Sequence, residues 1–486
     1  MEIIIVGAGF GGMSAGALLS RDGHEVTILE KNEQPGGRGS YFEDKGYYFD
    51  MGPSWYLMSE LYDNFFQEFD KKAEDFFNLK KLDPSYRIFL DKKRVWDISA
   101  NLEENYQLFD GFEENGGEKL KKYLQSSKEL YEFSLQEMLY RDYNSILDLL
   151  NGKLLFKGYK LRLWENLQHF IDRQFESEEA RKILQYAIGF LGGSPENAPS
   201  FYHLVSHSDL NLGVWYPQGG MRKVTQGIYD LALSQGVNFH FQEEVELLEV
   251  HEDRVKRVIS SEGFYEADVV VVNADYAHSE LDLLKPPYQS YDTNYWESRT
   301  ISPSALVAYL GIDSRVENLA HHNLFLNKDW DSGFEAVFNP EKKAWSEDSS
   351  YYVNVPSLTD DSAAPEGGET IYILAPLAPG LEDSDTLREK FLNQILDDLE
   401  EKIDFNIQDK VVVKKIFALN DFKTRYNAYK GTAFGLSHTM DQTALWRPAH
   451  KSKKVENLYY TGQYNHPGIG VPMTLVSSQI LSREIR

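Results

Sequence analysis

The chain has 486 residues, with 50 Lys and Arg against 76 Asp and Glu, no cysteine and a formal net charge of -26. This length exceeds the size at which one hydrophobic core keeps growing, so we expect more than one domain. The missing cysteines exclude disulfides, thiol nucleophiles, thiolate metal sites and iron–sulfur clusters, and the acidic balance argues against nucleic acid as a partner.

The sequence predicts neither a membrane span nor a secretory leader. No apolar run approaches the roughly 18 residues that a spanning helix needs, and runs such as Val269 to Val272 have the length of a strand. The first basic residue is Arg21, so the charged start of a signal peptide is missing. We therefore expect a cytoplasmic protein without a metal site, and contact with a membrane surface remains a separate question.

A Gly-rich turn follows the first predicted strand. The strand covers residues 3–6, the turn is Gly7–Gly12, and helical composition follows from Met13. The next strand, residues 25–29, is closed by Glu30, 18 positions after Gly12. This order is the dinucleotide-binding fingerprint, in which a helix N-terminus faces a pyrophosphate and the acidic residue holds a ribose. A βαβ unit with an incidental glycine loop is the alternative. The expected contacts are Gly7, Ala8, Gly9, Gly11, Gly12, Glu30 and Lys31.

A second Gly-rich turn with an arginine follows at Pro35–Ser40. It resembles the GGR element of the amine oxidase and carotenoid desaturase superfamily of flavoproteins, although a plain turn is the alternative. The resemblance implies that Gly37 and Arg38 run along the diphosphate of FAD. It also implies that the loop of residues 49–55 passes close to the isoalloxazine ring through Gly52, Pro53 and Ser54. Trp55 is a candidate wall of the substrate site or an ordinary core aromatic.

Residues 101–204 read as helices, including 119–139 and 178–191. Inside this stretch, residues 153–164 carry four positive charges and no negative one, interleaved with aromatic and aliphatic side chains. Such a segment is typical of a lipid headgroup interface, and an amphipathic core helix with a solvated basic face is the alternative. The candidate membrane contacts are Lys153, Lys157, Lys160, Arg162 and Trp164.

Strand and helix patterns alternate again from residue 214. A helix is predicted over 224–234, and strands over 245–250 and 268–272. In the superfamily, Val245 is where the backbone flanks the adenine, and Asn273 begins the element that returns the chain to the cofactor domain. A bare βαβ repeat explains the hydrophobic pattern equally well. Alternating apolar stretches between residues 300 and 415 predict a separate sheet.

The C-terminal signature runs from Asn457 to Met473. A strand ends at Gly462, a Gly/Pro-rich loop follows, and Pro472 suits the first turn of a helix. A helix N-terminus aimed at the flavin pyrimidine edge stabilises the negative charge of a flavin that accepts a hydride. We expect FAD contacts here from Gly462, Gly470, Val471, Pro472 and Met473. His466 is a candidate proton acceptor or contact for a substrate hydroxyl, and a structural role in its loop is the alternative.

Taken in order, these motifs closely resemble the bacterial phytoene desaturase type of carotenoid desaturase over essentially the whole chain. The resemblance implies an α/β fold with discontinuous domains. It predicts a Rossmann-like FAD-binding domain (1–100, 205–290 and 415–486), a helical, membrane-facing insertion (101–204) and a mixed-sheet substrate domain (291–414). Residues 463–465 are Gln, Tyr and Asn where smaller residues are expected, a departure that fits a subfamily with a different substrate.

The resemblance also implies noncovalent FAD, a membrane-embedded carotenoid substrate and insertion of a carbon–carbon double bond. Our interpretation is 3,4-desaturation of a 1′-hydroxycarotenoid, by hydride transfer to FAD with O₂ or a quinone as the final acceptor. Alternatives within the family are phytoene or diapophytoene desaturation and carotenoid oxidation. Alternatives outside it are a soluble amine oxidase or protoporphyrinogen-type oxidase, and a non-enzymatic prenyl-binding protein of the GDP-dissociation-inhibitor type.

Overall fold

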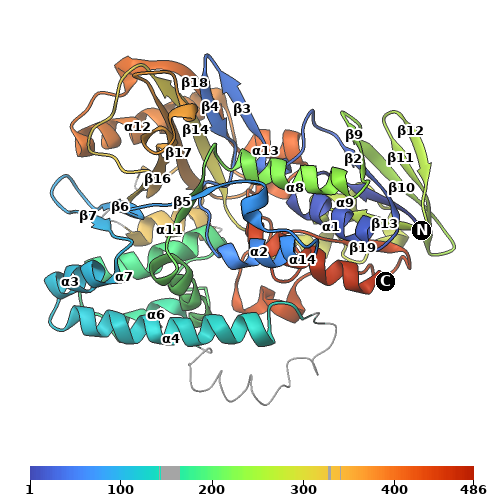
Figure 1. Cartoon of the computed structure of the whole chain (residues 1–486), viewed down its shortest axis with the longest axis horizontal. Helices are drawn as coiled ribbons and strands as arrows, with labels where there is room; N and C mark the ends of the chain where they lie inside the picture. The colour runs from blue at the N-terminus through green and yellow to red at the C-terminus, as the bar shows by residue number, and fades with distance from the viewer. Residues whose placement is uncertain (142, 144–164, 327–329, 340, 348, 486) are drawn as a thin grey trace.

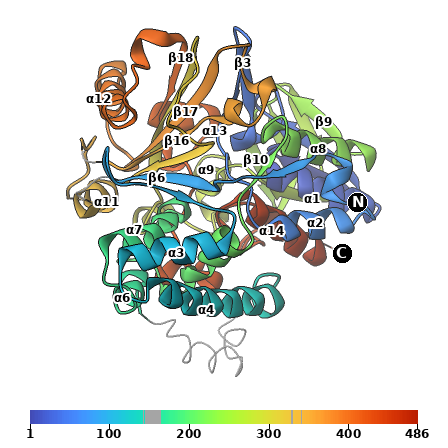
Figure 2. The same cartoon turned by 60° about the vertical axis from the view of Figure 1, so that its left-hand side comes forward.

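The computed structural model describes residues 1–141, 143, 165–326, 330–339, 341–347 and 349–485. The candidate membrane segment 153–164 lies outside these residues. Figures 1 and 2 show three regions: a parallel sheet beside both chain ends, a second sheet with helix α12 (Asp385–Ile403) above it, and helices beneath that second sheet. In the described part of the chain, no helix combines the length and the apolar character needed to cross a bilayer.

The first sheet has five parallel strands in the order β19-β13-β1-β2-β9. Their bounds are β1 (Glu2–Val6), β2 (Glu25–Glu30), β9 (Asn238–Phe241), β13 (Val269–Val272) and β19 (Leu458–Tyr460). Because side chains alternate along a strand, Ile3 and Ile5 pack on one face with the helices, and Ile4 and Val6 pack on the other. The apolar runs seen in the sequence are therefore strands that are buried on both faces.

Helices and a small sheet cover the two faces of this sheet. Helix α1 packs against α8 and α14, and α14 packs against α2. The bounds of these helices are α1 (Phe10–Arg21), α2 (Ser59–Gln67), α8 (Arg222–Ser234) and α14 (Val471–Glu484). The opposite face is covered by an antiparallel sheet whose strands are β10 (Val245–His251), β11 (Arg254–Ser260) and β12 (Gly263–Glu266).

The second sheet has seven strands in the order β18-β14-β17-β16-β15-β6-β7. Their bounds are β6 (Tyr86–Phe89), β7 (Val95–Ile98), β14 (Ser304–Ile312), β15 (His322–Phe325), β16 (Tyr351–Asn354), β17 (Glu369–Leu377) and β18 (Val411–Phe417). On β14, Leu306 and Leu310 share a core with α12, and Val307 and Tyr309 belong to the core on the other face.

The range 1–100, predicted for the FAD-binding domain, contains strands of both sheets. Strands β6 and β7 lie within that range, yet β6 pairs in parallel with β15 of the second sheet. Similarly, β18 crosses the predicted boundary at residues 414 and 415 and pairs with β14. Pairing between strands that are more than 200 residues apart leaves no local signal in the sequence, so the pattern of β6 and β7 did not reveal their sheet.

The predicted helical segment contains α3 (Leu102–Phe112), α4 (Gly116–Glu137), α6 (Leu167–Asp172) and α7 (Glu178–Gln185). Its end consists of 3₁₀ helices over Tyr186–Leu191 and Ser200–Leu204, and a π-helical turn over His207–Asn211 follows just beyond it. The remaining elements are β3 (Tyr41–Asp44), β4 (Tyr47–Asp50), β5 (Leu79–Lys81), β8 (Trp215–Pro217), α9 (Tyr276–Leu281), α10 (Thr293–Glu297), α11 (Trp330–Phe338) and α13 (Leu419–Tyr426).

Candidate functional site

A pocket of about 1040 Å³ lies at the carboxyl ends of strands β1, β2 and β13. Its floor is the Gly-rich turn between β1 and α1. A Cβ atom on Gly12 would lie 2.0 Å from the carbonyl oxygen of Gly7, so a side chain at this position would force the helix away from the strand. Helix α1 begins after Gly9 with no side-chain cap and no acidic residue in its first turn. Its first N–H groups therefore face the pocket as an anion site.

Glu30 closes β2 at the pocket wall and is almost fully buried. One carboxylate oxygen accepts a hydrogen bond from the backbone N–H of Ala8 at 2.8 Å. The other accepts from the N–H and the side-chain amide of Asn32, at 2.9 and 2.7 Å. These bonds fix the carboxylate beside the Gly-rich turn, where its remaining lone pairs can accept the hydroxyl groups of a ribose.

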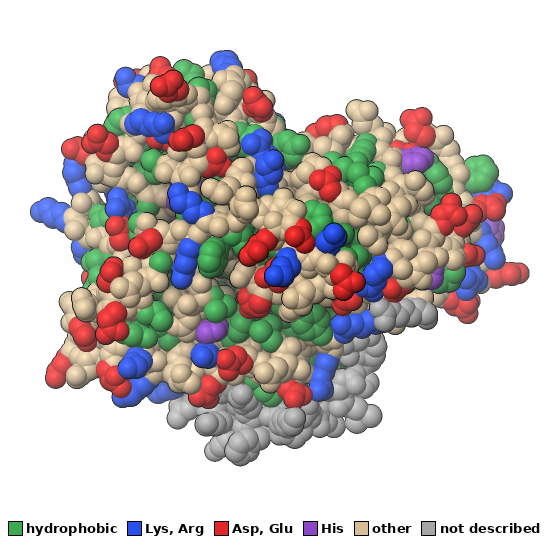
Figure 3. Space-filling model, viewed as in Figure 1, with side chains coloured by type: hydrophobic (Ala, Val, Ile, Leu, Met, Phe, Trp, Pro, Cys, Tyr) green, Lys and Arg blue, Asp and Glu red, His purple; other side chains and the backbone are tan. Residues whose placement is uncertain are grey.

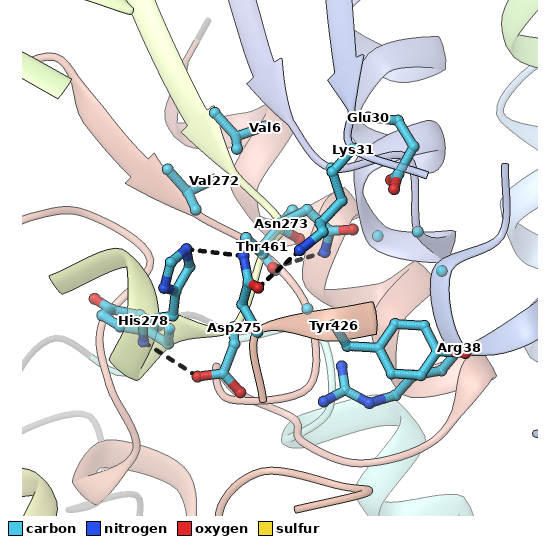
Figure 4. A pocket seen from close by; sticks show the side chains of 18 of the residues that line it. Val6, Glu30, Lys31, Arg38, Val272, Asn273, Asp275, His278, Tyr426 and Thr461 are labelled. Atoms are coloured by element: carbon cyan, nitrogen blue, oxygen red, sulfur yellow. Dashed lines mark hydrogen bonds between the residues drawn. The ribbon is translucent and has the colours of Figure 1, made fainter. Parts of the chain in front are cut away.

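The second Gly-rich turn lies directly against the first. The N–H of Gly36 donates to the carbonyl oxygen of Ala8 at 2.8 Å, and a Cβ atom on Gly37 would lie 3.2 Å from the Cα of Gly9. Arg38 leaves this turn and lies over the ring of Tyr426, 5.3 Å from its centroid. Figure 4 shows the Arg38 guanidinium on the side of the pocket that also holds Asp275.

Strands β13 and β19 supply the opposite wall. The side-chain amide of Asn273 donates to the carbonyl oxygen of Thr461 at 2.9 Å, next to Gly462. Asp275 accepts hydrogen bonds from the His278 N–H and from the Tyr464 hydroxyl, and burial raises the pKa of its carboxyl group. Val245 at the start of β10 also faces the pocket.

The rim contains residues that the sequence motifs did not predict. Asn427, after the end of α13, accepts a hydrogen bond from the Lys31 ammonium at 2.8 Å. Its amide nitrogen contacts Glu244 at 3.2 Å and His278 at 3.1 Å. Glu244, His278 and Asn427 come from separate elements, and none of them was among the predicted cofactor contacts.

Most of the predicted cofactor contacts meet in this pocket. The predicted residues that line it are Gly7, Gly9, Gly11, Glu30, Lys31, Gly37, Arg38, Val245, Asn273 and Gly462. Ala8 and Gly12 lie within the same turn. The loop Gly52–Ser54 lies behind Arg38, because a Cβ atom on Gly52 would be 2.3 Å from the Arg38 carbonyl oxygen.

The C-terminal signature approaches the pocket from the start of α14. Thr474 lines the pocket, and the helix begins after Gly470 with Pro472 in its first turn and no side-chain cap. Met473 belongs to a separate apolar cluster with Leu61 of α2. Gly470, Val471 and Pro472 thus form an uncapped helix N-terminus near the site.

His466 is held by a contact that favours a structural role. Its Nε2 donates to the carbonyl oxygen of Leu139 at 3.1 Å, and its ring meets the Tyr143 ring edge-on. Burial lowers the pKa of His466 to about 3, so the imidazole is neutral at neutral pH. A base role for His466 remains a prediction.

Trp55 lies in an aromatic cluster against the second sheet. Its ring stacks on His322 with centroids 4.2 Å apart, and Tyr86, Tyr186 and Tyr352 surround it. Tyr352 donates from its hydroxyl to Ser54 at 3.0 Å, so the cluster is tied to the loop before Trp55.

A second pocket of about 810 Å³ begins at this cluster and is mainly apolar. It lies between the second sheet and helix α11, and Tyr186 and Tyr352 form part of its wall. The apolar side chains that line it include Leu324, Leu326, Val337, Leu374, Pro376 and Phe434. A pocket with a mainly apolar lining suits a hydrocarbon ligand.

The residues of the first pocket fit FAD. The Nε of Arg38 is buried and has no hydrogen-bond partner among the described residues, so an anionic group would satisfy it. The turn Gly7–Gly12 forms a cradle that side chains would fill, and the uncapped start of α1 adds N–H donors. A pyrophosphate has the negative charge and the oxygen acceptors that would satisfy both the Arg38 guanidinium and these N–H donors.

Comparison with known proteins gives related sequences over the whole chain. The family model described as flavin containing amine oxidoreductase matches residues 10–486. A carotenoid 3,4-desaturase of Haloarcula japonica is 41% identical over 479 residues, which cover 98% of this chain and 96% of the relative. A zeta-carotene-forming phytoene desaturase of Myxococcus xanthus is 30% identical and covers 100% and 93%.

The same fold occurs among solved structures. The crystal structure of an oxidoreductase from Methanosarcina mazei superimposes with a TM-score of 0.67 at 17% identity, and the match covers 100% of both chains. At this identity the likeness concerns the fold alone.

Proposed function

This chain belongs to the carotenoid desaturases of the flavin containing amine oxidoreductase family, and from that membership we propose that it introduces the 3,4 double bond of a carotenoid. The observation that carries the proposal is the higher identity to the Haloarcula japonica 3,4-desaturase than to the Myxococcus xanthus phytoene desaturase. Both matches span nearly the full length of each chain, so the substrate region takes part in the comparison as well as the cofactor site.

The chain's own residues bind and orient the cofactor. FAD, when bound, supplies a hydride acceptor. The N–H groups at the start of α1 and the Arg38 guanidinium would hold its pyrophosphate, and Glu30 would hold the adenosine ribose. The loop Gly52–Ser54 and the start of α14 would flank the ring system, where the positive end of the helix stabilises negative charge on the flavin.

The apolar pocket beside Trp55 is the proposed substrate site. A polyene buries apolar surface there, at about 25 cal/mol per Å² removed from water, and this burial orients the allylic C–H bond without polar contacts along the chain. We propose a 1′-hydroxycarotenoid as the substrate. Because the cation that develops during hydride loss is delocalised along the polyene, positioning provides much of the catalysis.

We also propose that the protein works at a membrane surface, where its substrate is dissolved. O₂ or a quinone would then reoxidise the flavin. The candidate contacts with lipid lie outside the described residues; they are Lys153, Lys157, Lys160, Arg162 and Trp164. The proposal is supported by the charge pattern of this segment and by the apolar chemistry of the substrate.

The experiment that tests the reaction is expression in cells that accumulate single, known carotenoids. With a hydroxylated monocyclic carotenoid we expect a product that has lost two hydrogens, and a red shift of its absorption because the conjugated system is longer. Mass spectrometry and absorption spectra of extracted pigments measure both effects. A strain that makes only phytoene is the matched control, and desaturation of phytoene alone would contradict the 3,4-desaturase assignment.

A further inference from the structure

Asp209 is a buried carboxylate that the proposed site does not yet use. It lies in the π-helical turn His207–Asn211 and is 4% exposed. Its Oδ2 accepts two hydrogen bonds, from the Tyr86 hydroxyl at 2.9 Å and from the Tyr186 hydroxyl at 2.8 Å. Its Oδ1 is buried and has no hydrogen-bond partner among the described residues. Buried carboxylate oxygens usually accept a hydrogen bond, so one without a donor needs a physical explanation.

The two tyrosines differ in what else they contact. Tyr186 lines the apolar pocket, and its ring lies 6.5 Å from that of Trp55. Tyr86 comes from β6 and is fully buried. Tyr186 therefore links the carboxylate to the wall of the proposed substrate site, next to the loop that is expected to reach the flavin ring. Tyr86 stabilises the same carboxylate oxygen from the protein interior.

The surroundings of Asp209 favour proton exchange near neutral pH. Burial raises the pKa of Asp209 to about 7, and the hydrogen bonds from Tyr186 and Tyr86 limit the rise. No lysine or arginine in the described part of the chain forms an ion pair with it. The titratable side chains near it, on the same turn and on the elements packed around it, include Tyr86, Tyr123, Lys128, Glu132, Tyr186, His203 and His207.

We propose that Tyr186 takes the proton that the substrate loses and passes its own hydroxyl proton to Oδ2 of Asp209. This inference rests on the proposed function. One allylic C–H bond breaks as its hydrogen leaves with both electrons to FAD, which is reduced. The adjacent C–H bond breaks next, and its electron pair forms the new C=C bond while its proton moves to the Tyr186 oxygen. Asp209 becomes neutral and later releases the proton to solvent. Tyr186 is the catalytic residue, and Asp209 acts through it.

The first test is the pH profile of the FAD-loaded enzyme. We expect the wild-type rate to rise with pH through about 7, because the relay needs an ionised Asp209. Asp209→Asn keeps the shape of the side chain but removes the proton acceptor, and Tyr186→Phe removes the relay atom. Each of these two substitutions should lower kcat by about 100-fold or more. Each should also flatten the acid limb of the pH profile, which is the part where the rate rises with pH up to about 7. Asp209→Glu, which retains a carboxylate, should recover part of the rate and the acid limb.

Tyr86→Phe is the matched control, because it removes an equivalent hydrogen bond from the same oxygen but leaves Tyr186 in place. We expect a smaller loss of rate than in Tyr186→Phe and an acid limb at higher pH, since that bond lowers the Asp209 pKa. Equal losses in the two Phe variants would overturn the relay. An Asp209→Asn enzyme with the parental rate and acid limb would overturn it too. A wild-type enzyme that forms no carotenoid product would instead overturn the proposed function, and this inference with it.

The second test does not depend on turnover. The native pKa of Asp209 is above its unfolded value near 4, so the native protein binds more protons between about pH 4 and pH 7 and loses stability as pH rises through that range. Asp209→Asn should therefore raise Tm relative to wild type by a few degrees at about pH 8 and by less at about pH 5. A difference in Tm that does not change with pH would contradict the buried proton acceptor.

Discussion

Arg447 shows how one side chain supports the C-terminal signature. It is 4% exposed and its guanidinium donates to five backbone carbonyl oxygens, the shortest bond being 2.7 Å to Gln463. The other four acceptors belong to Leu436, Gln442, Tyr464 and Asn465. Burial lowers the pKa of Arg447 to about 10, so the group keeps its charge at neutral pH. The guanidinium group of arginine is planar and carries five N–H donors. No other side chain has enough donors to satisfy so many carbonyl groups at once.

Arg447→Met should therefore destabilise the loop that follows β19. The substitution leaves buried carbonyl oxygens without donors, at about 1–3 kcal/mol for each group that water cannot reach. We expect Tm to fall by about 5 °C or more and FAD to be lost during gel filtration, with Arg447→Lys intermediate. Arg257→Met, which changes a half-exposed arginine, is the control and should stay close to wild type. Parental Tm and flavin content in Arg447→Met would show that the loop holds its shape without these bonds.

Helix α13 closes the rim of the cofactor pocket from a distant part of the chain. The Arg425 guanidinium pairs with Glu33 at 2.8 Å, and the Arg425 carbonyl oxygen accepts from the amide of Asn32 at 3.3 Å. Tyr426 lies beneath Arg38, and Asn427 binds Lys31. The end of this short helix and the residue that follows it thus contact the loop after β2 at four positions, and they cover the side of the pocket where the adenosine ribose is expected.

Breaking the Glu33–Arg425 pair should speed the loss of FAD. The hydrogen bond from Arg425 is the main reason that the pKa of Glu33 is lowered to about 2, so the pair is intact at neutral pH and weakens only as pH falls from about 4.5 toward 2. Glu33 is about half exposed, so solvent screens the pair and its value is about 0.2–1 kcal/mol.

We therefore expect Glu33→Gln and Arg425→Gln each to raise the FAD dissociation rate by about 2- to 5-fold, and high salt to reduce the difference. Loss of flavin fluorescence quenching after dilution measures the rate. The double variant should match the single ones, and Glu43→Gln on β3 should match wild type. Additive effects of the two substitutions would mean that the residues act separately.

The comparison between sequence and structure is clearest at the level of elements. Neighbouring residues specify the unit that consists of β1, the Gly-rich turn, α1 and β2, so this unit could be predicted. The strands are rich in β-branched residues, glycines stand where helix and strand backbones must come close, and Glu30 follows the last glycine of the turn by 18 positions. The start of α14 was similarly marked by Pro472. Helix α13 carries no such motif, and its role follows from tertiary packing of segments almost 400 residues apart. For the same reason, the local pattern of β6 and β7 did not reveal that they belong to the second sheet.

The substrate region was the least predictable part of the site. Trp55 was identified from a family motif, but its partners His322, Tyr86 and Tyr186 come from three elements with no shared pattern. The same holds for Asp209, to which no sequence motif assigned a role. Burial turns it into a titratable group near neutral pH, and burial depends on the whole fold.

At the scale of the whole molecule, the net charge of -26 opposes contact with an anionic membrane. Figure 3 shows acidic and basic side chains mixed over one face, with no large area of a single sign on that face. Docking by electrostatic attraction therefore needs a local excess of cations. The sequence has such an excess at residues 153–164, outside the described residues, where four cations alternate with apolar side chains. Each cation near an anionic bilayer contributes about 1 kcal/mol.

We expect binding to anionic vesicles to fall by at least about tenfold at low salt when Gln replaces Lys153, Lys157, Lys160 and Arg162. These substitutions remove four positive charges, so the net charge of the protein becomes more negative than in wild type. Sedimentation with phosphatidylserine-containing vesicles measures this binding, and zwitterionic vesicles show how much depends on charge. The matched control replaces Lys71, Lys72, Lys93 and Lys256, four exposed lysines elsewhere, and thus changes the net charge equally. If both sets of substitutions weaken binding to the same extent, the overall charge governs docking and the segment 153–164 has no special role. Unchanged binding in the first set would locate membrane contact elsewhere on the protein.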